Sequence, residues 1–121
     1  MNAGGERIEE RLASLSKAYG EALSERVGQI EALYRTITRT GWRSEQYEEL
    51  KRLVHSLKGS GRTFGFPEIS ESASGLEELL DAVGLHGGGL DSPDWLKCED
   101  RIAGLKAAVG RADLGKHSRR T

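Results

Sequence analysis

The stretch Leu53-Val54-His55-Ser56-Leu57-Lys58-Gly59-Ser60-Gly61 decides how this chain folds and what it offers to a partner. An α-helix turns by about 100° per residue, and on that basis one stripe of the surrounding segment is apolar. It comprises Tyr47, Leu50, Leu53, Val54, Leu57, Gly61 and Phe64. His55 points about 140° away from the centre of this stripe. The pattern predicts a helix that buries the stripe and presents the imidazole to solvent.

Basic side chains surround His55 on the same helical surface. Lys51 lies four residues before it, Lys58 three after it and Arg62 seven after it, and Arg52 flanks this surface. A solvated charged face is the simpler interpretation of these residues. Because they gather beside a histidine, they are instead predicted to lie near a phosphoryl group and to stabilise its charge, Lys58 above all.

Two glycines in this helix need separate explanations, since glycine costs roughly 1 kcal/mol relative to alanine in a helix interior. Gly61 lies on the apolar stripe, where it indicates the close approach of a neighbouring helix. Gly59 lies on the face of His55, where packing does not explain it. We therefore predict that Gly59 leaves space for a phosphoryl group and a docking partner.

The run from His55 to Gly61, continued through Phe64-Gly65-Phe66, resembles the signature of histidine-containing phosphotransfer (HPt) domains, His-x-x-Lys-Gly followed by small residues. Leu76-Glu77 in the following segment resembles the Leu-Glu pair of these domains. Val54 departs from the family, which often has alanine there, but it lies toward the core. The resemblance extends over nearly all of the chain once its helices are considered.

This resemblance implies a phosphorelay protein in which His55 carries a phosphoryl group between the aspartates of receiver domains. Its partners would be receiver domains of response regulators or hybrid histidine kinases, docking on the exposed side of the first two helices. Mg²⁺ would belong to the receiver, so the chain needs no cofactor of its own. We expect Nε2 of His55 to accept the group because it projects furthest from the helix, and Lys58 and Gly59 to assist.

Apolar residues recur at three- and four-residue spacings in four segments, which predicts four helices. The first runs to about Arg39, and Gly20 favours a break that would leave a short extra N-terminal helix. The second follows an N-cap at Ser44, and it ends near Phe64 with Gly65 as a C-cap residue.

The third helix is predicted to begin at Pro67 and the fourth at Pro93, after an N-cap at Ser92, with a glycine-rich loop over 84–89 between them. No segment has the alternation of a strand. Short connections predict an all-α, antiparallel four-helix bundle in up-down-up-down order. The predicted domain spans 6–111, with flexible termini at 1–5 and 112–121.

Composition narrows the function classes further. A formal net charge of −1 with 31% charged residues disfavours a nucleic-acid binder, and no apolar run is long enough for a membrane span or a signal peptide. The chain is therefore expected in the cytoplasm, as a monomer by default. There is no Gly-x-x-x-x-Gly-Lys loop, so autonomous kinase activity is not expected.

The remaining candidate residues favour simpler interpretations. The histidines His55, His86 and His117 and the single cysteine, Cys98, are too scattered for a metal site, and Cys98 fits a small buried hydrophobe. His86 and His117 are predicted to be solvated, Trp42 and Trp95 to lie at the edge of the core, and Glu77 and Glu78 to form a charged face. Two alternatives remain open: a non-catalytic helical interaction module, or the phosphoacceptor domain of a larger histidine kinase.

Overall fold

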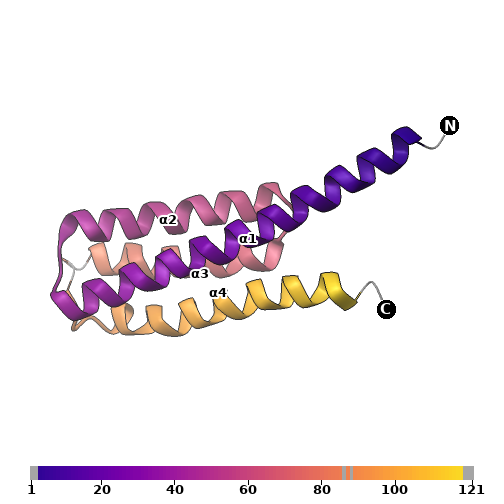
Figure 1. Ribbon diagram of the computed structural model, residues 1–121. Helices are drawn as coiled ribbons and strands as arrows, with labels where there is room; N and C mark the ends of the chain where they lie inside the picture. Colours follow the sequence, from indigo (N-terminus) through magenta and orange to yellow (C-terminus); the bar gives the residue numbers. More distant parts are fainter. Residues whose placement is uncertain (1–2, 86, 88, 119–121) are drawn as a thin grey trace.

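The computed structural model describes residues 3–118 apart from 86 and 88, with side chains mainly over 18–111. Four helices run in sequence order: α1 (Ala3–Thr40), α2 (Ser44–Thr63), α3 (Pro67–Leu85) and α4 (Pro93–Ser118). Successive helices are antiparallel, and the N-terminal part of α1 extends past the ends of α2 and α3 (Figure 1). The predicted up-down-up-down bundle is confirmed, with no strand in the described part of the chain.

The apolar stripes of the four helices form one core. α2 contributes Tyr47, Leu50, Val54 and Leu57, all buried, and Leu53 is partly buried. Phe64 is exposed, which corrects its placement on the buried stripe, because it follows the last residue of α2 as the C-cap. Burying a large aliphatic side chain contributes about 1.5–3 kcal/mol. Because α2 lies mainly against α3, and α3 against α4, the same burial fixes which side of each helix faces its neighbour.

The first helix is not broken at Gly20, which corrects the expectation of a short extra N-terminal helix. α1 is one helix of 38 residues. Tyr19 and Leu23 pack against the core on either side of Gly20. A single glycine costs only about 1 kcal/mol and does not remove a backbone hydrogen bond, so local packing outweighs it.

The ends of α2 confirm one predicted cap and correct the other. Arg43, with φ −137° and ψ 126°, is the N-cap residue and makes no side-chain capping bond, so Ser44 is the first helical residue. At the other end, the amide of Phe66 donates to the carbonyl of Gly61 at 2.7 Å, and Gly65 has φ +81°. This is a Schellman turn, in which glycine takes the left-handed conformation easily.

The last two helices begin at Pro67 and Pro93 as predicted. α3 continues to Leu85, so the glycine-rich loop is shorter than 84–89. α4 continues to Ser118, beyond the predicted domain end at 111 and into the predicted tail, because alanine, leucine and lysine in that segment are good helix formers. Residues 119–121 and 1–2 lie outside the described part of the chain.

None of the described helices has the length and apolarity that would span a membrane.

The two tryptophans differ in depth. Trp95 is 0% exposed, and its indole donates to the Thr38 hydroxyl at 3.1 Å while Tyr34 donates to its carbonyl at 2.8 Å. Trp42 is half-buried and meets Trp95 edge-on. Trp42 therefore lies at the edge of the core as predicted, whereas Trp95 lies in its interior because α1 covers the start of α4.

Candidate functional site

His55 lies on the solvent-facing side of α2, and its side chain is 75% exposed. Val54 and Leu57, on either side of it in the chain, are both buried. Their burial fixes the rotation of α2, and the helical period then directs His55 outward. The exposed position predicted from the apolar stripe is what the structure has.

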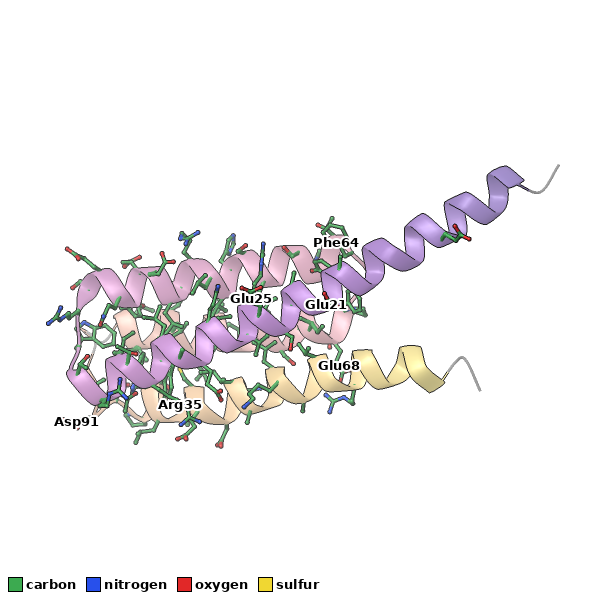
Figure 2. All side chains as sticks on the ribbon, in the orientation of Figure 1. Glu21, Glu25, Arg35, Phe64, Glu68 and Asp91 are labelled. Atoms are coloured by element: carbon green, nitrogen blue, oxygen red, sulfur yellow. The ribbon has the colours of Figure 1, made fainter. Side chains whose placement is uncertain are left out.

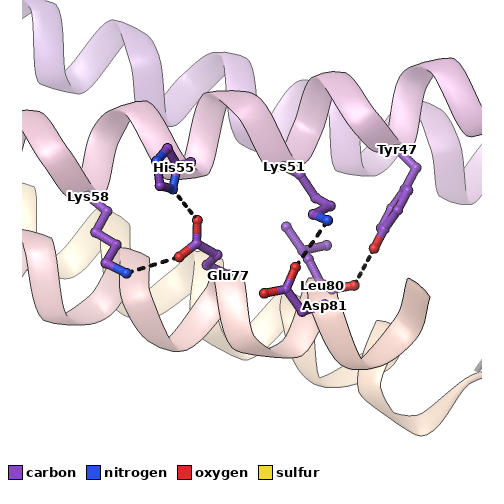
Figure 3. Close-up of polar contacts among 7 residues, drawn as sticks. All are labelled: Tyr47, Lys51, His55, Lys58, Glu77, Leu80 and Asp81. Atoms are coloured by element: carbon purple, nitrogen blue, oxygen red, sulfur yellow. Dashed lines mark hydrogen bonds and ion pairs between the residues drawn. The ribbon is translucent and has the colours of Figure 1, made fainter. Parts of the chain in front are cut away.

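The imidazole is held from α3 by Glu77. Nδ1 of His55 lies 2.6 Å from Oε2 of Glu77, and Nζ of Lys58 donates to Oε1 of the same carboxylate at 3.0 Å (Figure 3). Leu76 and Leu80 are buried on α3, which turns Glu77 toward α2. One carboxylate thus receives a bond from each of the two residues that define the sequence motif.

The charge state of Glu77 determines which ring nitrogen of His55 is free. Partial burial by itself would raise the pKa of Glu77, but the hydrogen bonds from His55 and Lys58, with the charge of Lys58, outweigh burial and lower it. Glu77 is therefore an ionised acceptor at neutral pH, and a 2.6 Å contact requires a proton on Nδ1. In a neutral imidazole this leaves the Nε2 lone pair unprotonated and directed away from Glu77.

The other predicted basic residues are not gathered at the imidazole. Lys51 reaches α3, where its ammonium lies 3.1 Å from Oδ1 of Asp81 (Figure 3). Arg52 makes a two-pronged contact with Glu49, with Nε 2.9 Å from Oε2. Arg62 is exposed, and no carboxylate within the described part of the chain pairs with it. Of the predicted cations, the structure brings only Lys58 into the network of His55.

The two glycines of α2 occupy different surroundings. A Cβ on Gly61 would lie 3.1 Å from the backbone nitrogen of Ser70, so Gly61 lets the start of α3 approach, as predicted. Ser70 also donates to the carbonyl of Lys58 at 3.0 Å across this contact. A Cβ on Gly59 would meet nothing within 4 Å. Gly59 therefore leaves open surface one helical turn from His55.

Glu77 is the residue whose importance sequence reasoning underestimated. The sequence predicts a charged face for Glu77 and Glu78, and Glu78 is exposed. The signal that could have distinguished them was the Leu76-Glu77 pair: Leu76 lies on the buried stripe, so the residue after it lies at the edge of the helix–helix contact. Which residue of α2 it meets depends on the packing of two helices, and that is not readable from α3 alone.

The remaining candidate groups lie apart from this site. Cys98 is buried, and burial, followed by the charge of Asp94, raises the pKa of its thiol to about 12, so it is inert as a nucleophile. His86 lies outside the described residues, and so does the side chain of His117. Within the described residues, no three groups of the metal-ligating kinds come together.

Comparison with known protein families agrees with this geometry. The family described as Hpt domain matches residues 6–114, which is most of the chain. Comparisons with curated proteins and with solved structures find no match. The matched range contains all of α2 and α3, and with them His55, Lys58 and Glu77.

Proposed function

The chain belongs to the Hpt domain family, which serves histidine phosphotransfer in two-component signalling, and on that premise we propose that His55 carries a phosphoryl group between the aspartates of receiver domains. The observation that supports this most strongly is the contact between His55 and Glu77. It holds an exposed imidazole with one nitrogen protonated and the other free.

The proposed reaction is a reversible transfer. The Nε2 lone pair attacks the phosphorus of an acyl phosphate on the receiver; the N–P bond forms as the P–O bond to the aspartate breaks, and the carboxylate leaves. The imidazole gains positive charge as it attacks, and the Glu77 carboxylate on Nδ1–H stabilises that charge. Transfer to a second receiver is the same step in reverse.

The surroundings of His55 fit this role. Lys58 lies one helical turn from His55; its ammonium pairs with Glu77 in the free protein, and we propose that it turns to the phosphoryl oxygens during transfer, while the open surface at Gly59 admits the receiver. The Mg²⁺ ion, which supplies charge neutralisation on the phosphoryl group, is proposed to come from the receiver. We further propose that the chain acts as a monomer in the cytoplasm, where it meets soluble receivers.

Transfer from a receiver labelled with ³²P tests the proposal. The wild type is expected to acquire acid-labile label, whereas His55→Gln acquires none. His117→Gln, which also removes one histidine, is the matched control and is expected to behave as the wild type. Label retained on His55→Gln would refute the assignment of His55. A wild type that takes up no label would instead indicate the non-catalytic interaction module.

A further inference from the structure

The contact between α1 and α2 carries a cation that lies outside the His55 network. Nη1 of Arg26, on α1, donates to the hydroxyl of Ser56 at 3.2 Å and of Ser60 at 3.4 Å. Ser56 directly follows His55, so this guanidinium is anchored one residue from the phosphoacceptor. We refer to Arg26, Ser56, Ser60 and Phe64 as the α1–α2 seam.

Arg26 differs from three of the four α2 cations near His55 in what it contacts; Arg62, like Arg26, pairs with no carboxylate in the described part of the chain. Lys51, Arg52 and Lys58 each pair with a carboxylate of this chain. Arg26 contacts two neutral hydroxyls, and no carboxylate in the described part of the chain pairs with it. Its full charge is therefore available to an outside acidic group, and a guanidinium matches a carboxylate with two parallel hydrogen bonds.

Fold stability does not account for this arrangement. The two bonds are exposed and lie at the long end of the hydrogen-bond range, and such contacts contribute little. The packing of α1 is supplied by Leu23, Val27 and Ile30, which are buried. The serine hydroxyls instead favour a guanidinium position on the seam, which slightly lowers the entropy lost when a partner binds it.

An exposed aromatic ring lies on the same seam. Phe64 is 60% exposed, although its ring centroid lies 4.3 Å from that of Tyr19 on α1, with the two rings tilted by 32°. Figure 2 shows Phe64 projecting from the end of α2 where α1 passes it. Aromatic and arginine side chains are enriched in protein interfaces. The seam thus combines an uncompensated charge with apolar area.

We infer that Arg26 is a docking residue, which binds a carboxylate on the receiver surface beside the phosphorylated aspartate. The inference rests on the proposed function. A receiver that supplies Mg²⁺ beside its aspartate must hold that ion with carboxylates, so the charge there is complementary to Arg26. Glu21 and Glu25 lie along the neighbouring part of α1 (Figure 2) and would repel a partner whose acidic surface extended further outward. Arg26 acts on docking and leaves the chemistry at Nε2 unchanged.

The test measures transfer kinetics from a receiver domain charged with acetyl phosphate. Arg26→Ala is expected to raise KM for the receiver about fivefold and to keep kcat within about twofold. Arg26→Gln, which keeps a donor for the serine hydroxyls but removes the charge, should have nearly the same effect. Arg26→Lys should recover part of the loss. Arg101→Ala, an equal charge change on α4, is the matched control and should leave KM unchanged.

Two further measurements separate docking from chemistry and from folding. Direct phosphorylation of His55 by phosphoramidate needs no receiver and should be equal in the wild type and all Arg26 variants. The KM difference should shrink in 0.5 M NaCl, because salt screens the charge pair. If Arg26→Ala proves unstable, Arg26→Gln decides the question, since it retains the donor.

Several outcomes would overturn the inference. Equal KM values for Arg26→Gln and Arg101→Ala would show that the charge of Arg26 does not contribute to binding of the receiver. A lower kcat together with slower phosphoramidate labelling would place Arg26 in the chemical step. A wild type that is labelled by phosphoramidate but by no receiver would refute the proposed function, and the docking role with it.

Discussion

The two flanks of α2 beside His55 are built differently. On the α3 flank, Glu77 receives bonds from both His55 and Lys58, so positive groups are compensated within the chain. On the α1 flank, Arg26 rests on neutral hydroxyls. The first arrangement fixes the imidazole before any partner arrives. The second leaves a charge for a partner to satisfy, so under the proposed function the α3 flank would orient the nucleophile and the α1 flank would bind the receiver.

Replacing Glu77 with alanine should remove the function of the α3 flank. The imidazole loses the acceptor that fixes its tautomer and stabilises its charge. We expect a loss of about 10–100-fold in transfer rate, as for carboxylates that orient metal-bound histidines. The transfer rate at saturating receiver measures this effect. Glu78→Ala, the adjacent exposed carboxylate, serves as the control, and equal rates for both variants would contradict the assigned role of Glu77.

Substitutions of Lys58 and Lys51 test whether the α3 flank promotes transfer through the single cation Lys58 or through any positive charge near His55. Both lie one helical turn from His55, but Lys58 shares Glu77 with it whereas Lys51 pairs with Asp81. We expect Lys58→Ala to slow single-turnover transfer about tenfold, because its charge stabilises the phosphoryl oxygens. Lys51→Ala should change the rate less than twofold. Similar losses in both would show that the ion pair with Asp81 does not separate Lys51 from the site.

Gly61 faces α3 and Gly59 faces open surface, so substitutions at the two positions should change the stability of the fold in opposite directions. Gly61→Ala places a Cβ 3.1 Å from a backbone atom of Ser70 and should destabilise the fold by about 1–3 kcal/mol. Gly59→Ala meets open space and should stabilise it by about 0.5–1 kcal/mol. Urea unfolding measures both changes.

A large residue at Gly59 should slow transfer from the receiver more than it destabilises the fold. A loss of stability without slower transfer would show that Gly59 serves packing.

The smallest expected effect is the change in unfolding free energy with pH that is due to the Glu77 carboxylate. Its pKa is lowered in the folded protein, so the unfolded chain binds the proton more readily as pH falls. The stabilisation is complete above the ordinary carboxyl range and is lost as pH falls through the lower folded-state pKa. Unfolding free energies of the wild type and Glu77→Gln, measured from pH 7 to pH 3, should converge in acid. Parallel curves would show that the carboxylate contributes no such stabilisation.

Most of the fold was predictable because it depends on periodicity within each segment. The spacing of Leu50, Val54 and Leu57 shows which side of α2 is buried, and Gly65 and Pro67 mark where one helix ends and the next begins. The prediction at Gly20 failed because the packing of Tyr19 and Leu23 outweighs a weak local preference. The prediction at Ser44 was one residue off, because serine is accepted at the first helical position as well as at the N-cap. A glycine or a serine at a given place permits a break or a cap, but neighbouring contacts decide whether one forms.

The site was predictable only as far as one helix could show it. The outward face of His55 and the position of Lys58 follow from α2 alone. The bond to Glu77 spans 22 residues and the contact of Arg26 with Ser56 spans 30, so both depend on how separate helices pack. Gly84 is similar: a Cβ there would overlap the Tyr47 hydroxyl, which donates to Leu80 at 2.5 Å, and nothing near Gly84 in sequence indicates this.

The most direct test of the account is ¹⁵N–¹H and ³¹P NMR of protein labelled at histidine nitrogens. Before phosphorylation, His55 should be protonated at Nδ1 with an unprotonated Nε2, and this tautomer preference should be lost in Glu77→Ala. After transfer from a charged receiver, phosphorus should couple to Nε2 of His55. Phosphorus on Nδ1, or a His55 that carries its neutral-form proton on Nε2, would contradict the account.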